Sequence, residues 1–552
     1  MTVHSVIEKQ MKKIFFITLL SALAVSSILA DHYPRNPNID IQHYTFKLTL
    51  SDTTDEITGE ASVEVKFLTA GTTGFNLDLV GRHSASSEYG MTVHYVELKD
   101  QEIPFKQEDD KLEISLPAHP AKDEVLSFKI SYSGVPADGL IISKDKYGER
   151  TFFGDNWPDR AHYWLPTIDH PYDKATCDFI ITAPAKYQVI ANGSLVEETD
   201  LNNGMRLTHW RESVPIPTKV MVIGAARFAV QYLKKFNCIP VETWVYPQDR
   251  QKGFYDFEPA EKIVKLFTNL IGPFPYEKLA NVESKTKYGG MENASNIFYS
   301  EQEVTGTRRS EVTVAHEIAH QWFGDAVSEE DWNHIWLSEG FATFFQDVFI
   351  ENQFGRDSLI NALKYQRQLV VRYDAANPFS PVVDTTITDL NNLLNINSYQ
   401  KGAWVLRMLQ HVVGDKDFWK GIRLYYKTYM NQNALTRDFQ KIMEEASGMD
   451  LSWFFSEWVY KPGLPYLNGK WSYNSKDKTV EINIEQAQPY DNIFKMPADV
   501  AIYLKQNNEP AIKRINIGKK DNSFYFKTGA EPENIILDPG TWILMKAELR
   551  KK

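Results

Sequence analysis

The residues best suited to chemistry are His316, Glu317 and His320, which stand in the order His-Glu-x-x-His inside an apolar-patterned segment. On a helix, side chains four residues apart lie on one face, about one turn from each other. Two imidazoles placed in this way can bind one metal ion through their ring nitrogens. Glu317 lies between them, close enough to take a proton from a water on that metal. The spacing therefore predicts a metal site with a general base beside it.

The alternative is that the two histidines lie on an exposed helix face. Apolar residues stand around them at Val312, Ala315, Ala319, Trp322 and Phe323. A freely solvated surface helix does not carry so many apolar residues. Buried imidazoles need polar partners, and one metal ion supplies a partner for both rings. This context favours the metal site.

Glu339 is the expected third metal ligand. It begins a second apolar-patterned segment that continues through Phe344 and Phe345. A catalytic zinc with two histidine ligands commonly takes a carboxylate as its third ligand and leaves the fourth position open for water. Magnesium prefers oxygen ligands throughout, so zinc is the better match. We expect one Zn²⁺ per chain, held by the two histidines and Glu339.

A glycine-flanked carboxylate precedes the metal-binding segment. Residues 289–293 are Gly289, Gly290, Met291, Glu292 and Asn293. The two glycines let a substrate backbone approach closely, and the segment can pair with it as an added strand. The Glu292 carboxylate can bind a free α-ammonium by a charge-assisted hydrogen bond. An ordinary turn carboxylate is the alternative, but the His-Glu-x-x-His pattern begins only 24 residues after Glu292. We therefore predict that this segment binds substrate and requires a free N-terminus.

These motifs support a family resemblance. Residues 314–325 and 336–343 resemble the zinc signature of the aminopeptidase N family of zinc metallopeptidases, the gluzincin aminopeptidases. That family also includes leukotriene hydrolase. Residues 289–293 match the family's amine-recognition motif, in which alanine often stands where this chain has Gly290. The resemblance implies a thermolysin-like, mostly α catalytic domain.

The resemblance extends to two further places. Tyr399 matches the family's tyrosine that donates to the oxyanion, and its phenol would stabilise charge developing on the scissile carbonyl oxygen. Residues 156–160 and 169–171 fall where family members place a loop that helps to bind the substrate amine. The family usually supplies glutamine or glutamate there, whereas this sequence offers Asn156 and Trp157. Which of the two makes the contact is left open.

The resulting expectation is a zinc-dependent aminopeptidase that hydrolyses N-terminal residues from peptides, with Glu317 as general base and Tyr399 as oxyanion donor. A zinc endopeptidase would share the metal site but not the amine-binding segment. An epoxide hydrolase like leukotriene hydrolase needs a long apolar cavity, which a sequence does not show. A catalytically silent peptide-binding protein would normally have lost a ligand or the base, and all are present here.

The remaining patterns predict an α+β multidomain protein. Residues 31–235 contain alternating apolar and polar runs, such as residues 44–50, and are expected to form an N-terminal antiparallel β domain. Helical spacing dominates the expected zinc catalytic domain, residues 236–462. Pro462 and Gly463 interrupt this pattern, and residues 480–484 alternate again. Residues 463–552 are expected to form a small C-terminal β-sandwich domain.

The first 30 residues have the pattern of a secretory signal peptide. Lys12 and Lys13 precede an apolar run from Ile14, and small residues lead to Ala30. We expect translation to start at Met11 and cleavage to follow near Ala30. An uncleaved membrane anchor is the alternative, but the apolar run is marginal for a span. The pattern predicts an exported protein, periplasmic in a bacterium or fully secreted, with no stable membrane insertion after cleavage.

Composition limits the partners. The 552 residues carry a net charge of −12, and a pI of about 5.6 argues against nucleic acid, which binds basic surfaces. The expected partners are peptides with a free N-terminus. The two cysteines, Cys177 and Cys238, could pair in an exported protein, but a chain of this length can fold without a disulfide. Their pairing is left open.

Overall fold

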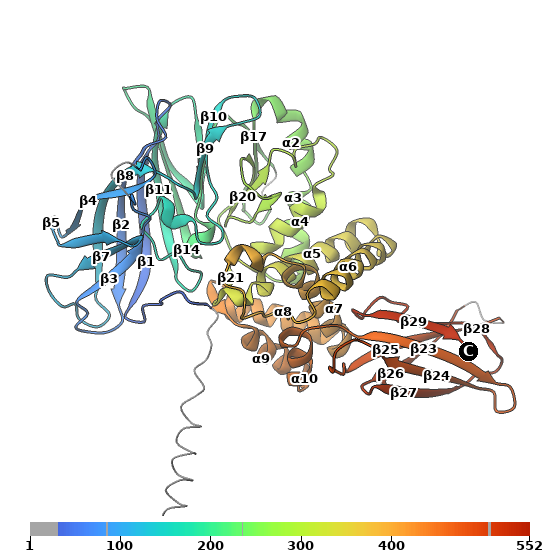
Figure 1. Cartoon of the computed structure of the whole chain (residues 1–552). Coiled ribbons are helices and arrows are strands. Elements are labelled where there is room, and N and C mark those ends of the chain that lie inside the picture. Colours follow the sequence, from blue (N-terminus) through green and yellow to red (C-terminus); the bar gives the residue numbers. More distant parts are fainter. Residues whose placement is uncertain (1–30, 84–86, 234–235, 506–508) are drawn as a thin grey trace, which may run out of the picture.

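The computed structural model describes residues 31–83, 87–233, 236–505 and 509–552, so the predicted signal peptide lies outside the described residues. Along the chain, a β-rich region comes first, a region containing most of the helices follows, and a second β region ends the chain (Figure 1). This order confirms the expected α+β architecture. The exact domain limits stay a prediction.

The first region is built on one large twisted sheet and two smaller ones. The large sheet has the order β13-β14-β11-β1-β2-β8-β4-β5. Its strands are β1 (Ile39–Thr49), β2 (Ile57–Phe67), β4 (Gly90–Leu98), β5 (Gln101–Glu102), β8 (Val125–Val135), β11 (Lys174–Pro184), β13 (Ser194–Asp200) and β14 (Met205–Pro217). The smaller sheets are formed by β3 (Gly74–Asp78), β6 (Phe105–Glu108) and β7 (Lys111–Ser115), and by β9 (Leu140–Lys144), β10 (Arg150–Gly154), β12 (Gln188–Ala191) and β15 (Ile223–Ala226).

The expectation of a purely antiparallel first domain is wrong at one pair. Strands β1 and β11 run parallel, with His43 opposite Thr176 and Thr49 opposite Thr182. A parallel pair needs a long crossover connection. Here the chain passes through β2 to β10 and then through residues 155–173 before it returns to β1. That last connection is the one that reaches the pocket described below.

The second region begins with a five-stranded mixed sheet. Its order is β16-β17-β18-β20-β19, and β16 lies before the predicted boundary at residue 235 yet pairs with β17 beyond it. The strands are β16 (Ala229–Tyr232), β17 (Val241–Val245), β18 (Leu279–Ser284), β19 (Gly290–Met291) and β20 (Asn296–Ser300). Part of the predicted substrate-binding segment is therefore the edge strand β19.

The helices fill the middle of the molecule (Figure 1); two of them lie between β17 and β18 in the chain, and the others follow β20. The helices are α2 (Arg250–Phe257), α3 (Ala260–Leu270), α4 (Glu311–His320), α5 (Trp336–Phe354), α6 (Arg356–Ala376), α7 (Gly402–Val413), α8 (Asp415–Tyr429), α9 (Thr436–Ser447) and α10 (Ser452–Phe455), with a short parallel pair of β21 (Val327–Glu329) and β22 (Gln432–Ala434). One π-helical turn, Asn397–Lys401, directly precedes α7. Another, Ser456–Tyr460, directly follows α10. Figure 1 shows α4 and α5 near the middle of the molecule, below α2 and α3 and above α8, α9 and α10.

Helix α5 is the centre of the second region because it packs against both α4 and α7. Its contact with α7 depends on two glycines. A Cβ atom on Gly340 would lie only 2.9 Å from the Cα of Gly402, so the two backbones approach more closely than larger residues would allow. This approach brings the turn that carries Tyr399 beside the helix that carries Glu339.

The third region consists of two small sheets. They have the orders β27-β24-β23-β29 and β26-β25-β28. The strands are β23 (Tyr466–Asn474), β24 (Thr479–Gln486), β25 (Met496–Leu504), β26 (Ala511–Ile517), β27 (Asp521–Lys527), β28 (Pro532–Leu537) and β29 (Lys546–Lys551). Alternate residues of β24 and of the first part of β23 are buried, as expected for strands with one face in a core.

Two further observations concern the whole described chain. Cys177 is buried, Cys238 is exposed, and both are free, so the structure contains no disulfide between them. Among the described residues, no helix is both long enough and apolar enough to cross a membrane.

Candidate active site

The three predicted metal ligands converge at one point. His316 and His320 lie in the last turns of α4, and Glu339 lies in the first turn of α5. The two histidine Nε2 atoms are 3.1 Å apart. Each of them lies 3.3 Å from Oε2 of Glu339. All three side chains are buried or nearly so.

This arrangement fits a zinc ion. Three ligand atoms at tetrahedral angles, each about 2.1 Å from one ion, would lie about 3.4 Å from one another. The separations of 3.1 and 3.3 Å are close to this value. Two imidazole nitrogens and one carboxylate oxygen are also the donor set that a catalytic zinc takes. The residues present therefore fit the predicted metal.

A second layer of contacts orients His320. Its Nδ1 atom lies 3.0 Å from Oγ of Ser338 and 3.2 Å from the carbonyl oxygen of Phe323. Such contacts fix which ring nitrogen is free to bind a metal. Burial lowers the pKa of His320, but the carboxylates of Glu339 and Glu292 outweigh it and raise the pKa to about 10. The site thus concentrates negative charge where a cation would bind.

Glu317 points into the same space from α4. It is buried, and β19 approaches its carboxylate so closely that a side chain at position 290 would require the carboxylate to shift. A Cβ atom there would lie 2.3 Å from Oε1 of Glu317. Burial raises the pKa of Glu317 well above its usual value, and the charges of Glu292 and Glu339 raise it further. A raised pKa suits a carboxylate that must accept and return a proton near neutral pH.

Glu292 has a buried carboxylate oxygen without a partner. Its Oε1 atom makes no hydrogen bond within the described part of the chain. Ligand atoms of Glu292, Glu317 and His320 all lie within 4.8 Å of one another. An unsatisfied buried acceptor is unfavourable, and a substrate ammonium would supply the missing partner.

Gln321 holds the Glu292 segment against α4, and sequence analysis did not assign it a role. Its Nε2 donates to the carbonyl oxygen of Glu292 over 2.8 Å, and its Oε1 accepts from the backbone N–H of Ser295 over 2.7 Å. The residue is completely buried. The available signal was a carboxamide directly after His320 in an otherwise apolar run, since a buried amide must find partners.

The remaining predicted residues differ in their relation to the site. Tyr399 lies on the π-helical turn, and its ring is stacked on that of His316 with centroids 5.8 Å apart. Burial raises the pKa of its phenol well above 10, so the phenol stays protonated and can donate. Gly289 is exposed, and its carbonyl accepts from Ser300 over 3.0 Å. Asn293 is buried with its amide unpaired among the described residues and does not line the pocket.

One small pocket joins these groups. Its volume is about 50 Å³. It is lined by Trp157, Tyr288, Gly290, Met291, Glu292, His316, Glu317, His320, Glu339, Leu394 and Tyr399. The sequence-predicted ligands, base, phenol and amine-binding carboxylate therefore face one space.

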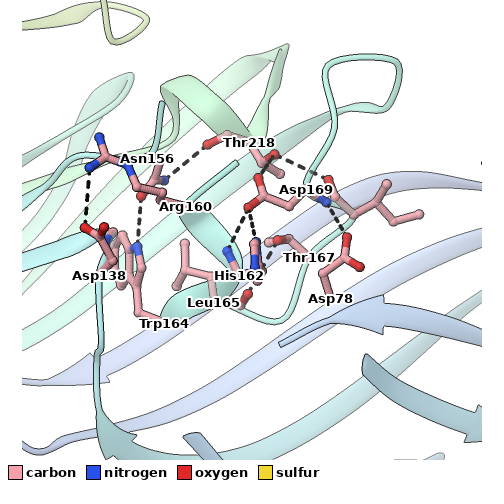
Figure 2. Close-up of polar contacts among 12 residues, drawn as sticks. Asp78, Asp138, Asn156, Arg160, His162, Trp164, Leu165, Thr167, Asp169 and Thr218 are labelled. Atoms are coloured by element: carbon pink, nitrogen blue, oxygen red, sulfur yellow. Dashed lines mark hydrogen bonds and ion pairs between the residues drawn. The ribbon is translucent and has the colours of Figure 1, made fainter. Parts of the chain in front are cut away.

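The structure also separates the roles of Asn156 and Trp157. The amide nitrogen of Asn156 donates to the carbonyl oxygens of Met221 and Thr218 over 2.6 and 3.2 Å. Its oxygen accepts from the indole N–H of Trp164 over 2.9 Å (Figure 2). The Asn156 side chain is thus used inside the first region, and Trp157 is the neighbour that lines the pocket.

Comparison with known proteins places the first two regions of this chain with the domains of one peptidase family. The family described as "Peptidase family M1 domain" matches residues 255–458, and "Peptidase M1 N-terminal domain" matches residues 41–220. "Probable aminopeptidase 2" of Sulfurisphaera tokodaii is 27% identical over 470 residues, which cover 82% of this chain and 57% of that protein.

Two further relatives show the same relation. "Glutamyl aminopeptidase" of Rattus norvegicus is 25% identical over 76% of this chain and 48% of its own length. "Aminopeptidase M1-A" of Oryza sativa subsp. japonica is 28% identical over 57% of this chain and 37% of its own length. The chain therefore spans 57% or less of the length of each of these three relatives.

Proposed function

Since this chain belongs to peptidase family M1, we propose that it is a zinc-dependent aminopeptidase that removes N-terminal residues from peptides. The observation that carries the exopeptidase part is the buried carboxylate oxygen of Glu292 beside Glu317 and His320, which has no hydrogen-bond partner among the residues that the structure describes. That oxygen can anchor a free ammonium at a fixed distance from the predicted metal. Relatives that carry the name aminopeptidase support the proposal.

The metal would be held by His316, His320 and Glu339, whose donor atoms lie 3.1 to 3.3 Å apart. When bound, zinc supplies Lewis-acid polarisation of the scissile carbonyl and makes a water more acidic.

The other side chains would position the substrate and move protons. Glu317 takes a proton from the attacking water and passes it to the leaving amine. The phenol of Tyr399 donates to the carbonyl oxygen as negative charge develops on it. Glu292 binds the ammonium, and the free edge of β19 can pair with the substrate backbone. Together these contacts place the first peptide bond over the predicted metal.

The pocket favours substrates whose first side chain is neutral. Three carboxylates line it, from Glu292, Glu317 and Glu339, and no Lys or Arg stands among its described lining residues. An acidic first side chain would lie beside these carboxylates and would find no Lys or Arg partner among the described lining residues. We therefore do not extend to this chain the glutamyl selectivity in the names of several relatives.

The decisive experiment compares free and blocked N-termini. Purified protein is assayed with alanyl-aminomethylcoumarin and with its N-acetylated form, each with and without a chelator. We expect release of the fluorophore only from the free substrate, loss of activity with the chelator, and recovery on addition of Zn²⁺. Efficient cleavage of the acetylated substrate would favour an endopeptidase and remove the proposed role of Glu292.

We also propose that the protein is exported, to a periplasm or to the medium, on the basis of the charged and apolar pattern of residues 12–30. Its partners would then be peptides in that compartment. Cell fractionation followed by N-terminal sequencing tests this. Recovery of intact protein starting at Met11 from the cytoplasm would contradict it.

A further inference from the structure

Trp157 is the wall of the pocket contributed by the first region. It lies in the connection between β10 and β11 and is 1% exposed. The other lining residues all come from the second region, between Tyr288 and Tyr399. The first residue of a bound peptide would therefore lie between the zinc-binding elements and this indole.

The pocket has little room. Its volume of about 50 Å³ is far below the roughly 300–1,000 Å³ of pockets that enclose drug-sized ligands. The apolar side chains that could limit a substrate side chain are Trp157, Met291 and Leu394, together with the ring of Tyr288. A large first side chain would have to displace at least one of them.

These walls differ in how readily they can move. Met291 is unbranched, and such side chains adapt to irregular spaces. Leu394 and Tyr288 are only half-buried. Trp157, in contrast, is itself buried and packs edge-on against the buried ring of Trp332, with centroids 5.9 Å apart, as well as against Tyr288 at 5.9 Å.

The backbone around Trp157 is held equally firmly. Its carbonyl oxygen accepts from Nε of Arg160 over 2.7 Å, and Arg160 also pairs with the buried carboxylate of Asp155 over 3.0 Å. Figure 2 shows the contacts of Arg160 with Asp138 and of Asn156 with Thr218, which tie this connection to two other loops of the first region. Since backbone and ring are both fixed, Trp157 is the wall that yields least.

We propose that Trp157 determines specificity by limiting the first residue of the substrate to a small side chain, such as that of glycine or alanine. The inference rests on the proposed aminopeptidase function. Alanine fits between the indole and the predicted zinc-binding elements, whereas phenylalanine or leucine meets the indole. A smaller residue at position 157 would leave this part of the pocket open to larger substrate side chains.

The test measures kcat/KM for alanyl- and phenylalanyl-aminomethylcoumarin with the full zinc-loaded protein. For the wild type we expect the alanyl substrate to be favoured by about 100-fold or more, because one rigid wall excludes a whole aromatic ring. Trp157→Leu and Trp157→Ala should lower this ratio by about tenfold or more, chiefly through higher activity on the phenylalanyl substrate. A matched control is Trp210→Leu, at a tryptophan that is also buried but lies outside the pocket.

The outcomes separate the two proposals. A wild type that cleaves both substrates equally well overturns the proposed role of Trp157 and leaves the aminopeptidase proposal intact. An unchanged alanyl-to-phenylalanyl ratio in folded, zinc-loaded Trp157→Leu has the same consequence. A wild type that cleaves no aminoacyl substrate overturns the aminopeptidase proposal itself. Should the variants fail to fold, the wild-type ratio alone decides, since a ratio near one is incompatible with a rigid Trp157 wall.

Discussion

The side-chain amide of Gln321 donates to the backbone carbonyl of Glu292 over 2.8 Å. Helix α4 carries two of the predicted zinc ligands, His316 and His320. Gln321, the next residue, holds the segment that faces the substrate amine. The same amide also donates to Asp325 over 2.9 Å, so Gln321 is fixed on both sides. Metal binding and amine binding are consequently linked through one buried carboxamide.

We expect Gln321→Leu to lower kcat/KM for free aminoacyl substrates by about tenfold or more, mainly through KM. The substitution leaves the carbonyl of Glu292, the N–H of Ser295 and the carboxylate of Asp325 without this partner, which costs about 1–3 kcal/mol for each buried group. Zinc content should stay at one ion per chain. Gln368→Leu, at an exposed position on α6, is the control. Unchanged kinetics with zinc bound would show that Gln321 does not position Glu292.

Glu292→Gln should raise KM for free substrates by about 10- to 100-fold, because a neutral amide loses the charge-assisted bond to the ammonium. Discrimination between free and acetylated substrates should fall by a similar factor. The matched control is Glu303→Gln, at a nearby carboxylate that does not line the pocket. Discrimination that survives in Glu292→Gln would assign ammonium recognition to another group.

Glu317→Gln should keep zinc bound and reduce kcat by about 10²- to 10⁴-fold, the usual contribution of a general base. The amide is nearly the same size as the carboxylate, so the contact with β19 is preserved while the proton acceptor is removed. Metal analysis and turnover are measured on the same preparation. Full activity in this variant would exclude Glu317 as the base.

Local spacing made most of the site predictable. His316, Glu317 and His320 follow from one helix turn, and Glu339 follows from the start of the next apolar helix. Partners brought together by the fold were not predictable. Asn156 bonds Met221 and Thr218, which lie 65 and 62 residues away, and no local pattern distinguishes it from Trp157 as the pocket residue.

Strand pairing had the same limitation. Alternation along residues 44–50 identifies a strand and its buried face, but it carries no information about the neighbour. Strands β1 and β11 pair in parallel although the chain between them forms strands of all three sheets of the first region. Similarly, β16 pairs with β17 across the predicted domain boundary at residue 235, and no local pattern indicates this partner. Sequence patterns therefore predicted the elements and the family better than the partners of each element.

Zinc removal should lower the melting temperature as well as abolish activity. His316, His320 and Glu339 are packed together in the interior, and a ligand that binds only the folded state stabilises it by mass action, about 2.7 kcal/mol at a concentration 100 times its Kd. Calorimetry of protein treated with a chelator, before and after Zn²⁺ is added back, measures the shift. Equal melting temperatures with and without zinc would show that this cluster does not hold the metal.

Asp173 offers a test of stability against pH that does not involve the site. It is 5% exposed, and within the described ranges its carboxylate accepts one long hydrogen bond, from the N–H of Ile41 at 3.5 Å. Burial raises its pKa from 3.8 to about 8, and the charge of Asp40 contributes to the shift. The folded protein therefore binds a proton here that the unfolded chain releases.

The difference in proton binding between the folded and unfolded chain sets how the stability contributed by Asp173 changes with pH. The stabilisation is complete below about pH 4 and falls as pH rises toward 8, by at most about 1.4 kcal/mol per pH unit, because the native state holds the extra proton. Asn cannot ionise, so the melting temperature of Asp173→Asn relative to the wild type should increase steadily from pH 5 to pH 8. The exposed Asp109→Asn is the control and should show no such trend. A difference between Asp173→Asn and the wild type that does not change with pH would mean that Asp173 is ionised in the folded protein, with a partner that its single long contact does not provide.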